Sequence, residues 1–132
     1  MNIALFFITH EGIASNLLNI AEAIIQRPNS NIDFLEIPMD ASTDHACDDI
    51  NNQIASLETE NGILFITDIF GGTPSNIAQT VAEKHNAYVI SGVNLPMVIR
   101  LLNYRNEVET ELLQKALDGA HHGIQLKKHY EH

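Results

Sequence analysis

A histidine and an aspartate follow two apolar segments of this 132-residue chain. His10 comes directly after the apolar run 3–9, and Asp68 directly after the run 62–67. An imidazole that donates from Nδ1–H to a carboxylate keeps the Nε2 lone pair free as a nucleophile, and the carboxylate stabilises the positive charge that develops on the ring. Either residue alone is more often an ordinary loop or turn residue. Together they predict a catalytic pair suited to phosphoryl transfer.

A glycine-rich segment with the sequence GGTPSN, residues 71–76, follows the second apolar run. Thr73 is expected to cap a helix and Pro74 to be its first residue. Because the N–H groups at a helix start are free to bind anions, we predict that Gly71, Gly72 and Thr73 hold the phosphoryl oxygens. A plain capped helix after a glycine turn is the alternative interpretation.

The usual nucleotide-binding patterns are missing from the sequence. It has no Gly-x-x-x-x-Gly-Lys and no Gly-x-Gly-x-x-Gly after a strand, so a single phosphoryl group fits better than ATP or NAD. A flavodoxin-like domain that binds a flavin or a nucleotide is therefore the weaker alternative. A Ser-His-Asp hydrolase is disfavoured because the Gly-x-Ser-x-Gly elbow is absent. Neither a cofactor nor a metal ion is predicted.

Short apolar runs alternate with amphipathic segments, which is typical of an α/β fold with a parallel sheet and helices on both faces. Strands are predicted at 3–9, 32–37, 62–67 and 87–91, and helices at 13–26, 44–57, 74–85, 95–102 and 108–120. In the strand order 2-1-3-4, the carboxyl ends of the first and third strands meet at the point where ligands bind. Residues 124–127 alternate with a period of two and predict a short last strand, although a frayed tail fits equally well.

The composition describes an acidic chain that can bury one compact core. Hydrophobic residues make up 45% of the chain and its formal net charge is -10, which disfavours nucleic acids and anionic membranes as partners. Cys47 is the only cysteine and cannot form an internal disulfide. No apolar run approaches the roughly 20 residues of a membrane span, and the first residues do not resemble a signal peptide. We expect a cytoplasmic protein.

Three stretches together resemble the mannose-family IIA components of the bacterial phosphoenolpyruvate-dependent sugar phosphotransferase system. They are His10 after the first strand, TDIFGGTPSN at 67–76 and GVNLPM at 92–97. The resemblance covers nearly the whole chain and implies a single IIA domain over residues 1–132. It also implies a phosphotransferase in which His10 carries the phosphoryl group and Asp68 orients the ring.

The resemblance extends to partners and to further site residues. It implies the phosphocarrier HPr as donor, a separate IIB component as acceptor in sugar uptake, and a homodimer that exchanges the strand at 124–127. Thr73 stands where the family commonly has a serine. Phe70 is predicted either as part of a docking face or as a core residue, and Asn94 and Met97 are predicted as partner contacts. A regulatory phosphoprotein that acts on a non-transport partner is the alternative function.

Overall fold

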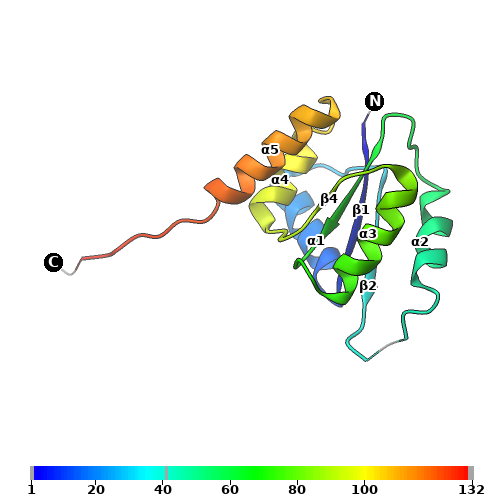
Figure 1. Cartoon of the computed structure of the whole chain (residues 1–132). Helices are drawn as coiled ribbons and strands as arrows, with labels where there is room; N and C mark the ends of the chain where they lie inside the picture. The colour runs from blue at the N-terminus through cyan, green and yellow to red at the C-terminus, as the bar shows by residue number, and fades with distance from the viewer. Residues whose placement is uncertain (1, 41, 131–132) are drawn as a thin grey trace.

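The computed structural model describes residues 2–40 and 42–130 and contains one parallel sheet with helices on both faces (Figure 1). The strands are β1 (Ala4–His10), β2 (Ile32–Ile37), β3 (Ile63–Thr67) and β4 (Val89–Ile90). The helices are α1 (Ala14–Ile25), α2 (Ala46–Ile54), α3 (Thr73–His85), α4 (Leu95–Asn103) and α5 (Glu109–His122). The strand order is β2-β1-β3-β4, so the predicted fold class and strand order are confirmed.

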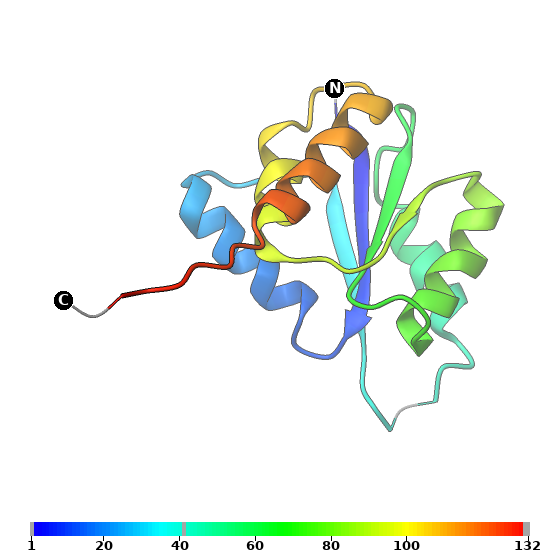
Figure 2. The ribbon, with the colours of Figure 1, turned by 60° about the vertical axis from the view of Figure 1, so that its left-hand side comes forward.

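The central strand β1 divides the hydrophobic core into two layers. Leu5 and Phe7 pack with α1, α4 and α5, whereas Ala4, Phe6 and Ile8 pack with α2 and α3. Successive side chains of a strand point to opposite faces, so a strand covered on both sides is apolar along its whole length. Figure 2 shows the two groups of helices on opposite sides of the sheet. This arrangement explains why the run 3–9 is continuously apolar.

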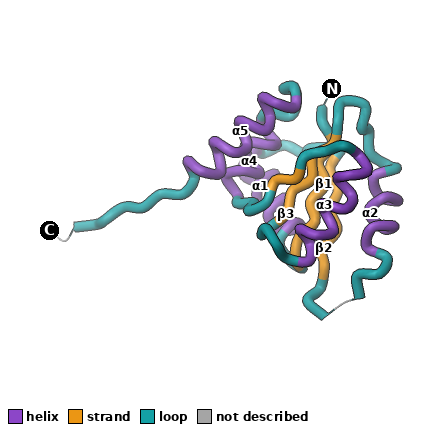
Figure 3. The backbone as a smooth tube through the Cα atoms, viewed as in Figure 1, coloured by secondary structure: helices purple, strands orange, loops and turns teal. Residues whose placement is uncertain are grey.

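The C-terminal segment differs from the prediction. Residues 124–130 form no strand, and the chain leaves the end of α5 as an extended tail that points away from the sheet (Figure 3). A strand exists only when its backbone pairs with another, and no strand of this chain lies beside the tail. Ile124 and Leu126 are therefore exposed, by 74% and 99%. The predicted last strand is wrong for a single copy of the chain, and its exchange between two copies stays a prediction.

The fourth strand and the second helix are shorter than the sequence suggests. β4 lies at the edge of the sheet and pairs with β3 only through Val89 and Ile90. The acidic helix α2 begins at Ala46 rather than 44 and ends at Ile54 rather than 57. None of the helices in the described residues combines the length and the apolar character needed to cross a membrane.

Candidate active site

His10 and Asp68 lie at the carboxyl ends of the neighbouring strands β1 and β3. Nδ1 of His10 is 2.7 Å from Oδ2 of Asp68, and the backbone N–H of His10 donates to the same oxygen at 3.0 Å. The other carboxylate oxygen accepts the backbone N–H of Ile69 at 3.0 Å. With its proton on Nδ1, the ring donates to the carboxylate and leaves the Nε2 lone pair free. The predicted proximity is confirmed, whereas the catalytic roles stay predictions.

Burial and hydrogen bonding act in opposite directions on Asp68. Partial burial raises the pKa of its carboxyl group, but the hydrogen bonds from the backbone and ring of His10 lower the pKa by more, so it lies below its ordinary value. The Asp68 side chain is 9% exposed and the His10 side chain 30% exposed. The pair therefore combines a fixed carboxylate with a ring that a second protein can reach.

A buried threonine fixes the turn that carries His10. The Thr9 hydroxyl donates to the carbonyl oxygen of His10 at 2.8 Å and accepts the backbone N–H of Ala14, the first residue of α1, at 3.1 Å. Gly12 has a φ of 87°, a conformation that a side chain would strain. The hydroxyl thus ties the end of β1 to the start of α1, and the histidine backbone has little freedom to move.

The start of α3 lies against the histidine ring. Gly72, not Thr73, is the N-cap residue, because the carbonyl oxygen of Gly72 accepts the first helical hydrogen bond from the N–H of Asn76 at 3.0 Å. The prediction that Thr73 caps the helix is wrong by one residue, and Thr73 is instead its first residue. A Cβ atom placed on Gly72 would lie 3.5 Å from Cε1 of His10, and Gly71 makes the preceding turn with a φ of 90°.

A small hollow opens beside the ring. It has a volume of about 230 Å³ and is lined by His10, Ile37, Pro38, Met39, Thr43 and Thr73. The N–H groups of the first turn of a helix have no partner within the helix, and the helix dipole makes this end attractive to anions. Thr73 and His10 therefore line one hollow, and the binding of a phosphoryl group by Gly71, Gly72 and Thr73 stays a prediction.

Apolar side chains surround the site on the surface. Phe70 is 75% exposed and Ile69 56% exposed, so the interpretation of Phe70 as a core residue is excluded. Met39, which the sequence gave no reason to place here, is 82% exposed and lines the hollow beside His10. Sequence patterns missed it because a single methionine in a loop carries no period that would separate a buried from an exposed position.

The two other predicted partner contacts have structural roles. Met97 is only 2% exposed and belongs to the core beneath α4, so it offers no surface to another protein. Asn94 caps α4 by accepting the N–H of Met97 at 3.0 Å, and its amide donates to the carbonyl oxygen of Ala120 at 3.1 Å. The prediction that Met97 contacts a partner is thus wrong in this structure, and the segment GVNLPM contains a helix cap followed by a core residue.

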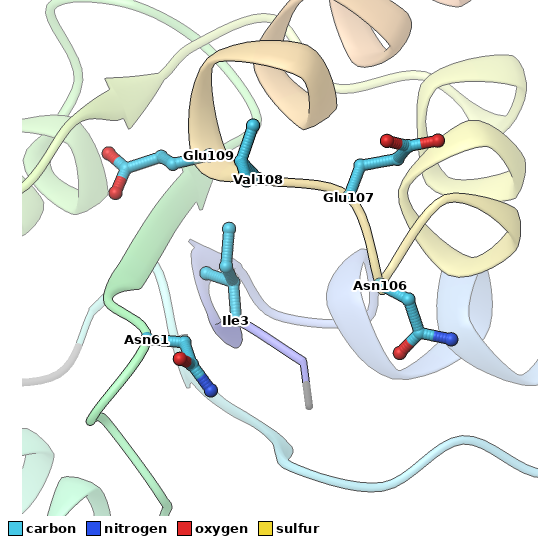
Figure 4. Close-up of a pocket in the computed structure, with 6 residues that line it drawn as sticks. All are labelled: Ile3, Asn61, Asn106, Glu107, Val108 and Glu109. Carbon is cyan, nitrogen blue, oxygen red and sulfur yellow. The ribbon is translucent and has the colours of Figure 1, made fainter.

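A second hollow at the opposite, amino end of the sheet has a different character. It measures about 390 Å³ and is lined by Ile3, Asn61, Asn106, Glu107, Val108 and Glu109 (Figure 4). Two carboxylates in this lining would repel a phosphoryl group. This hollow is therefore unsuited to a phosphoryl group.

The chain is thus an α/β protein whose parallel sheet holds a histidine–aspartate pair at its carboxyl edge. The model of a family described as the PTS system fructose IIA component, EIIA-man, matches residues 4–117. The chain belongs to this family, the mannose-type IIA components of the sugar phosphotransferase system. Proteins of this family are phosphotransferases that work through a phosphohistidine.

Individual relatives agree with this assignment. The chain is 31% identical over 131 residues to the mannose-specific EIIAB component of Escherichia coli K12, a match that covers 97% of this chain and 40% of that protein. The chain thus spans about 40% of the length of the curated relative. A match to the fructose-specific EIIA component of Bacillus subtilis is 38% identical over 56 residues, which is 42% of this chain and 38% of that protein.

Solved structures share the fold over nearly the whole chain. A sugar phosphotransferase system permease from Klebsiella pneumoniae has a TM-score of 0.78 at 28% identity, covering 96% of this chain and 91% of the other. The mannose/sorbose-specific IIA subunit from Enterococcus faecalis has a TM-score of 0.84 at 18% identity, covering 99% and 98%. At that identity the second likeness establishes the fold alone.

Proposed function

We propose that this chain, over residues 1–132, is a IIA-type phosphocarrier that holds a phosphoryl group on Nε2 of His10. The observation that carries the proposal is the 2.7 Å contact between Nδ1 of His10 and Asp68, on a ring that is still 30% exposed. A buried pair would be inaccessible to a partner, and an unpaired ring would have no fixed tautomer. The geometry therefore suits a histidine that must be both oriented and reachable.

The transfer follows from the placement of these groups. Nε2 of His10 attacks the phosphorus of the phosphorylated donor, a new N–P bond forms, and the donor's bond to phosphorus breaks with its electron pair. Asp68 stabilises the imidazolium that results, and the N–H groups at the start of α3 with the Thr73 hydroxyl receive the phosphoryl oxygens. In the second half of the cycle, the acceptor attacks the same phosphorus and His10 leaves as the neutral ring.

The proposed partners are phosphorylated HPr as donor and a IIB component as acceptor, in the cytoplasm. Phe70, Ile69 and Met39 form an exposed apolar rim beside His10 against which a partner can dock. The formal charge of -10 favours a basic or neutral partner surface and speeds its approach at low salt. Both partners must use one surface, since both must reach the same nitrogen.

Pairing of the tail with a second copy is part of the proposal. Residues 124–127 alternate in character, and Ile124 and Leu126 are exposed in the single chain. Sedimentation of the full chain and of a version without residues 124–132 tests this. We expect a dimer for the full chain and a monomer for the shortened one; a monomeric full chain would contradict the exchange.

The deciding experiment is phosphorylation of the purified chain by phosphoenolpyruvate, Enzyme I and HPr. We expect an acid-labile, alkali-stable phosphoryl group on the wild type and on His85→Ala, which changes an exposed histidine at the far end of α3, and none on His10→Ala. Labelling of His10→Ala, or none of the wild type, would overturn the proposal. A IIB component added afterwards separates transport from regulation, because a regulatory carrier would keep its label.

A further inference from the structure

Two helices begin at the edge of the sheet where His10 lies. α1 begins at Ala14, four residues after His10, and α3 begins at Thr73, five residues after Asp68. Each helix start carries about half a positive charge, so each attracts an anion such as the phosphoryl group. Within the described part of the chain, neither N-cap residue makes a side-chain capping bond. The two helix starts are therefore competitors for one anion.

The start of α1 is already filled by a carboxylate from another strand. Oε2 of Glu36 in β2 accepts the backbone N–H of Ser15 at 2.8 Å and the Ser15 hydroxyl at 2.8 Å. Ser15 is the second residue of α1, so Glu36 caps this helix from a distance of 21 residues along the chain. Sequence patterns could not find this contact, since no capping motif joins residues so far apart.

Glu36 is held in its charged form. Burial raises the pKa of its carboxyl group, but the hydrogen bonds from the Ser15 backbone and hydroxyl and from the Gly12 backbone lower the pKa by more, so it lies below its ordinary value. A full negative charge therefore faces the helix start at neutral pH.

The register of β1 and β2 separates Glu36 from the reacting ring. Glu36 is the neighbour of Thr9, and Ile37 is the neighbour of His10. Ile37 packs in the layer of α2 and α3 and lines the hollow that His10 shares with Thr73. Because successive side chains point to opposite faces, Glu36 lies on the α1 side and Ile37 on the α3 side.

We propose that Glu36 is a positioning residue that occupies the anion-binding start of α1 and thereby directs the phosphoryl group on His10 to the start of α3. This inference rests on the proposed function of His10. Glu36 also opposes the dianionic phosphoryl group by charge repulsion, so it keeps the phosphorylated form ready to pass the group on. Removing its charge should make the phosphohistidine more stable and the transfer to the next protein less favourable.

Glu36→Gln removes the charge but keeps an oxygen that can accept the Ser15 N–H. We expect the phosphoryl-transfer equilibrium with HPr to shift toward the phosphorylated chain by about two- to fivefold, the factor that corresponds to a charge at a helix end. The ³¹P resonance of the phosphohistidine should move as well, because the electric field of the Glu36 carboxylate at the phosphoryl group is lost. A merely structural role of Glu36 would move neither quantity.

Asp33→Asn is the matched control. It removes the same charge from the same strand three residues earlier, next to Phe6 rather than the end of β1. We expect its equilibrium and its ³¹P resonance to equal those of the wild type. If Glu36→Gln and Asp33→Asn behave alike while the wild type is phosphorylated, the role of Glu36 is refuted and that of His10 stands. If the wild type is not phosphorylated, the proposed function itself fails.

A measurement on the unaltered chain covers the case in which Glu36→Gln does not fold. Coupling between two sites is reciprocal, so the phosphoryl group must raise the pKa of the Glu36 carboxyl by the same factor by which Glu36 weakens phosphorylation. Carboxyl ¹³C NMR of the wild type with and without the phosphoryl group measures this change. A pKa that rises supports the proposal, and one that stays unchanged overturns it.

Discussion

The two ends of the sheet both bury charged groups, but they use them differently. At the carboxyl end, Asp68 binds a histidine ring that remains 30% exposed. At the amino end, Arg105 is only 4% exposed and donates to the carbonyl oxygens of Ile3 at 2.7 Å and of Asn31 at 3.3 Å. Its Nε and Nη1 atoms have no hydrogen-bond partner among the described residues, and burial lowers its pKa to about 10.

The comparison distinguishes Asp68, a candidate active-site residue, from Arg105, a residue with a structural role. Arg105 joins the α4–α5 loop to the starts of β1 and β2, and its bonds end on backbone carbonyls that do not change charge. Asp68 instead bonds to a ring that can gain and lose charge, and a partner can reach that ring. A charged residue can take part in catalysis when the group it bonds to is exposed and can change its charge. It has a structural role when that group is buried and cannot change its charge. We therefore expect substitutions at the carboxyl end to lower activity and those at the amino end to lower stability.

The largest effect is expected at His10. His10→Ala should abolish phosphoryl transfer, because it removes the imidazole that is proposed to carry the phosphoryl group. The free energy of unfolding should fall by less than about 1 kcal/mol, since the side chain lies at the end of a strand and contributes little packing. Phosphotransfer assays and urea unfolding on the same preparation check both halves. A large loss of stability in this variant would show that His10 has a structural role as well. The distinction between the two ends of the sheet would then fail.

The next effect is expected at Asp68. Asp68→Asn keeps the size of the side chain but cannot stabilise the imidazolium, so the transfer rate should fall by about 100-fold with the fold intact. Rapid-quench measurement of transfer from phosphorylated HPr checks this. A rate equal to that of the wild type would mean that the carboxylate only holds the His10 backbone, through the 3.0 Å bond from its N–H.

The sequence predicted most of the elements that position this site. Nearly continuous apolar runs predicted the strands that precede His10 and Asp68, because a strand buried on both faces is mostly apolar. The juxtaposition of the two side chains then followed from the strand order. The glycine turn followed by a threonine and a proline at 71–74 predicted the start of α3 to within one residue.

Sequence patterns did not predict the long-range contacts or the exposure of individual side chains. The cap on α1 comes from Glu36, and only the parallel pairing of β1 and β2 brings it to Ser15. The exposure of Met97 was predicted wrongly, because the sequence pattern of an apolar residue after a helix cap is the same whether its side chain points inward or outward. The tail at 124–127 has the alternation of a strand, yet a strand forms only with a partner that the sequence of one chain does not supply.

At the amino end, Arg105→Met should reduce the free energy of unfolding by about 1 to 3 kcal/mol, because it removes the bond of 2.7 Å to the carbonyl oxygen of Ile3 and the weaker bond to that of Asn31, which keeps the N–H of Leu5 as a donor. The transfer activity of the folded protein should equal that of the wild type. Thermal unfolding and phosphotransfer assays on one sample check the two expectations. Unchanged stability would mean that the free-energy cost of burying the guanidinium equals the gain from its hydrogen bonds. Arg105 would then not stabilise the fold.

The smallest effect is the pH dependence of stability that Asp68 contributes. Its folded-state pKa is lowered, so its contribution is fully present above the pKa of the unfolded carboxyl, near 4, and is lost as the pH falls through the lower folded-state pKa. Urea unfolding of the wild type and of Asp68→Asn between about pH 2 and pH 7 isolates this contribution. We expect the difference in stability between the two proteins to shrink as the pH falls below about 4. A difference that persists at the lowest pH would assign the effect of Asp68 to packing rather than to its charge, and the carboxyl end would then resemble the amino end.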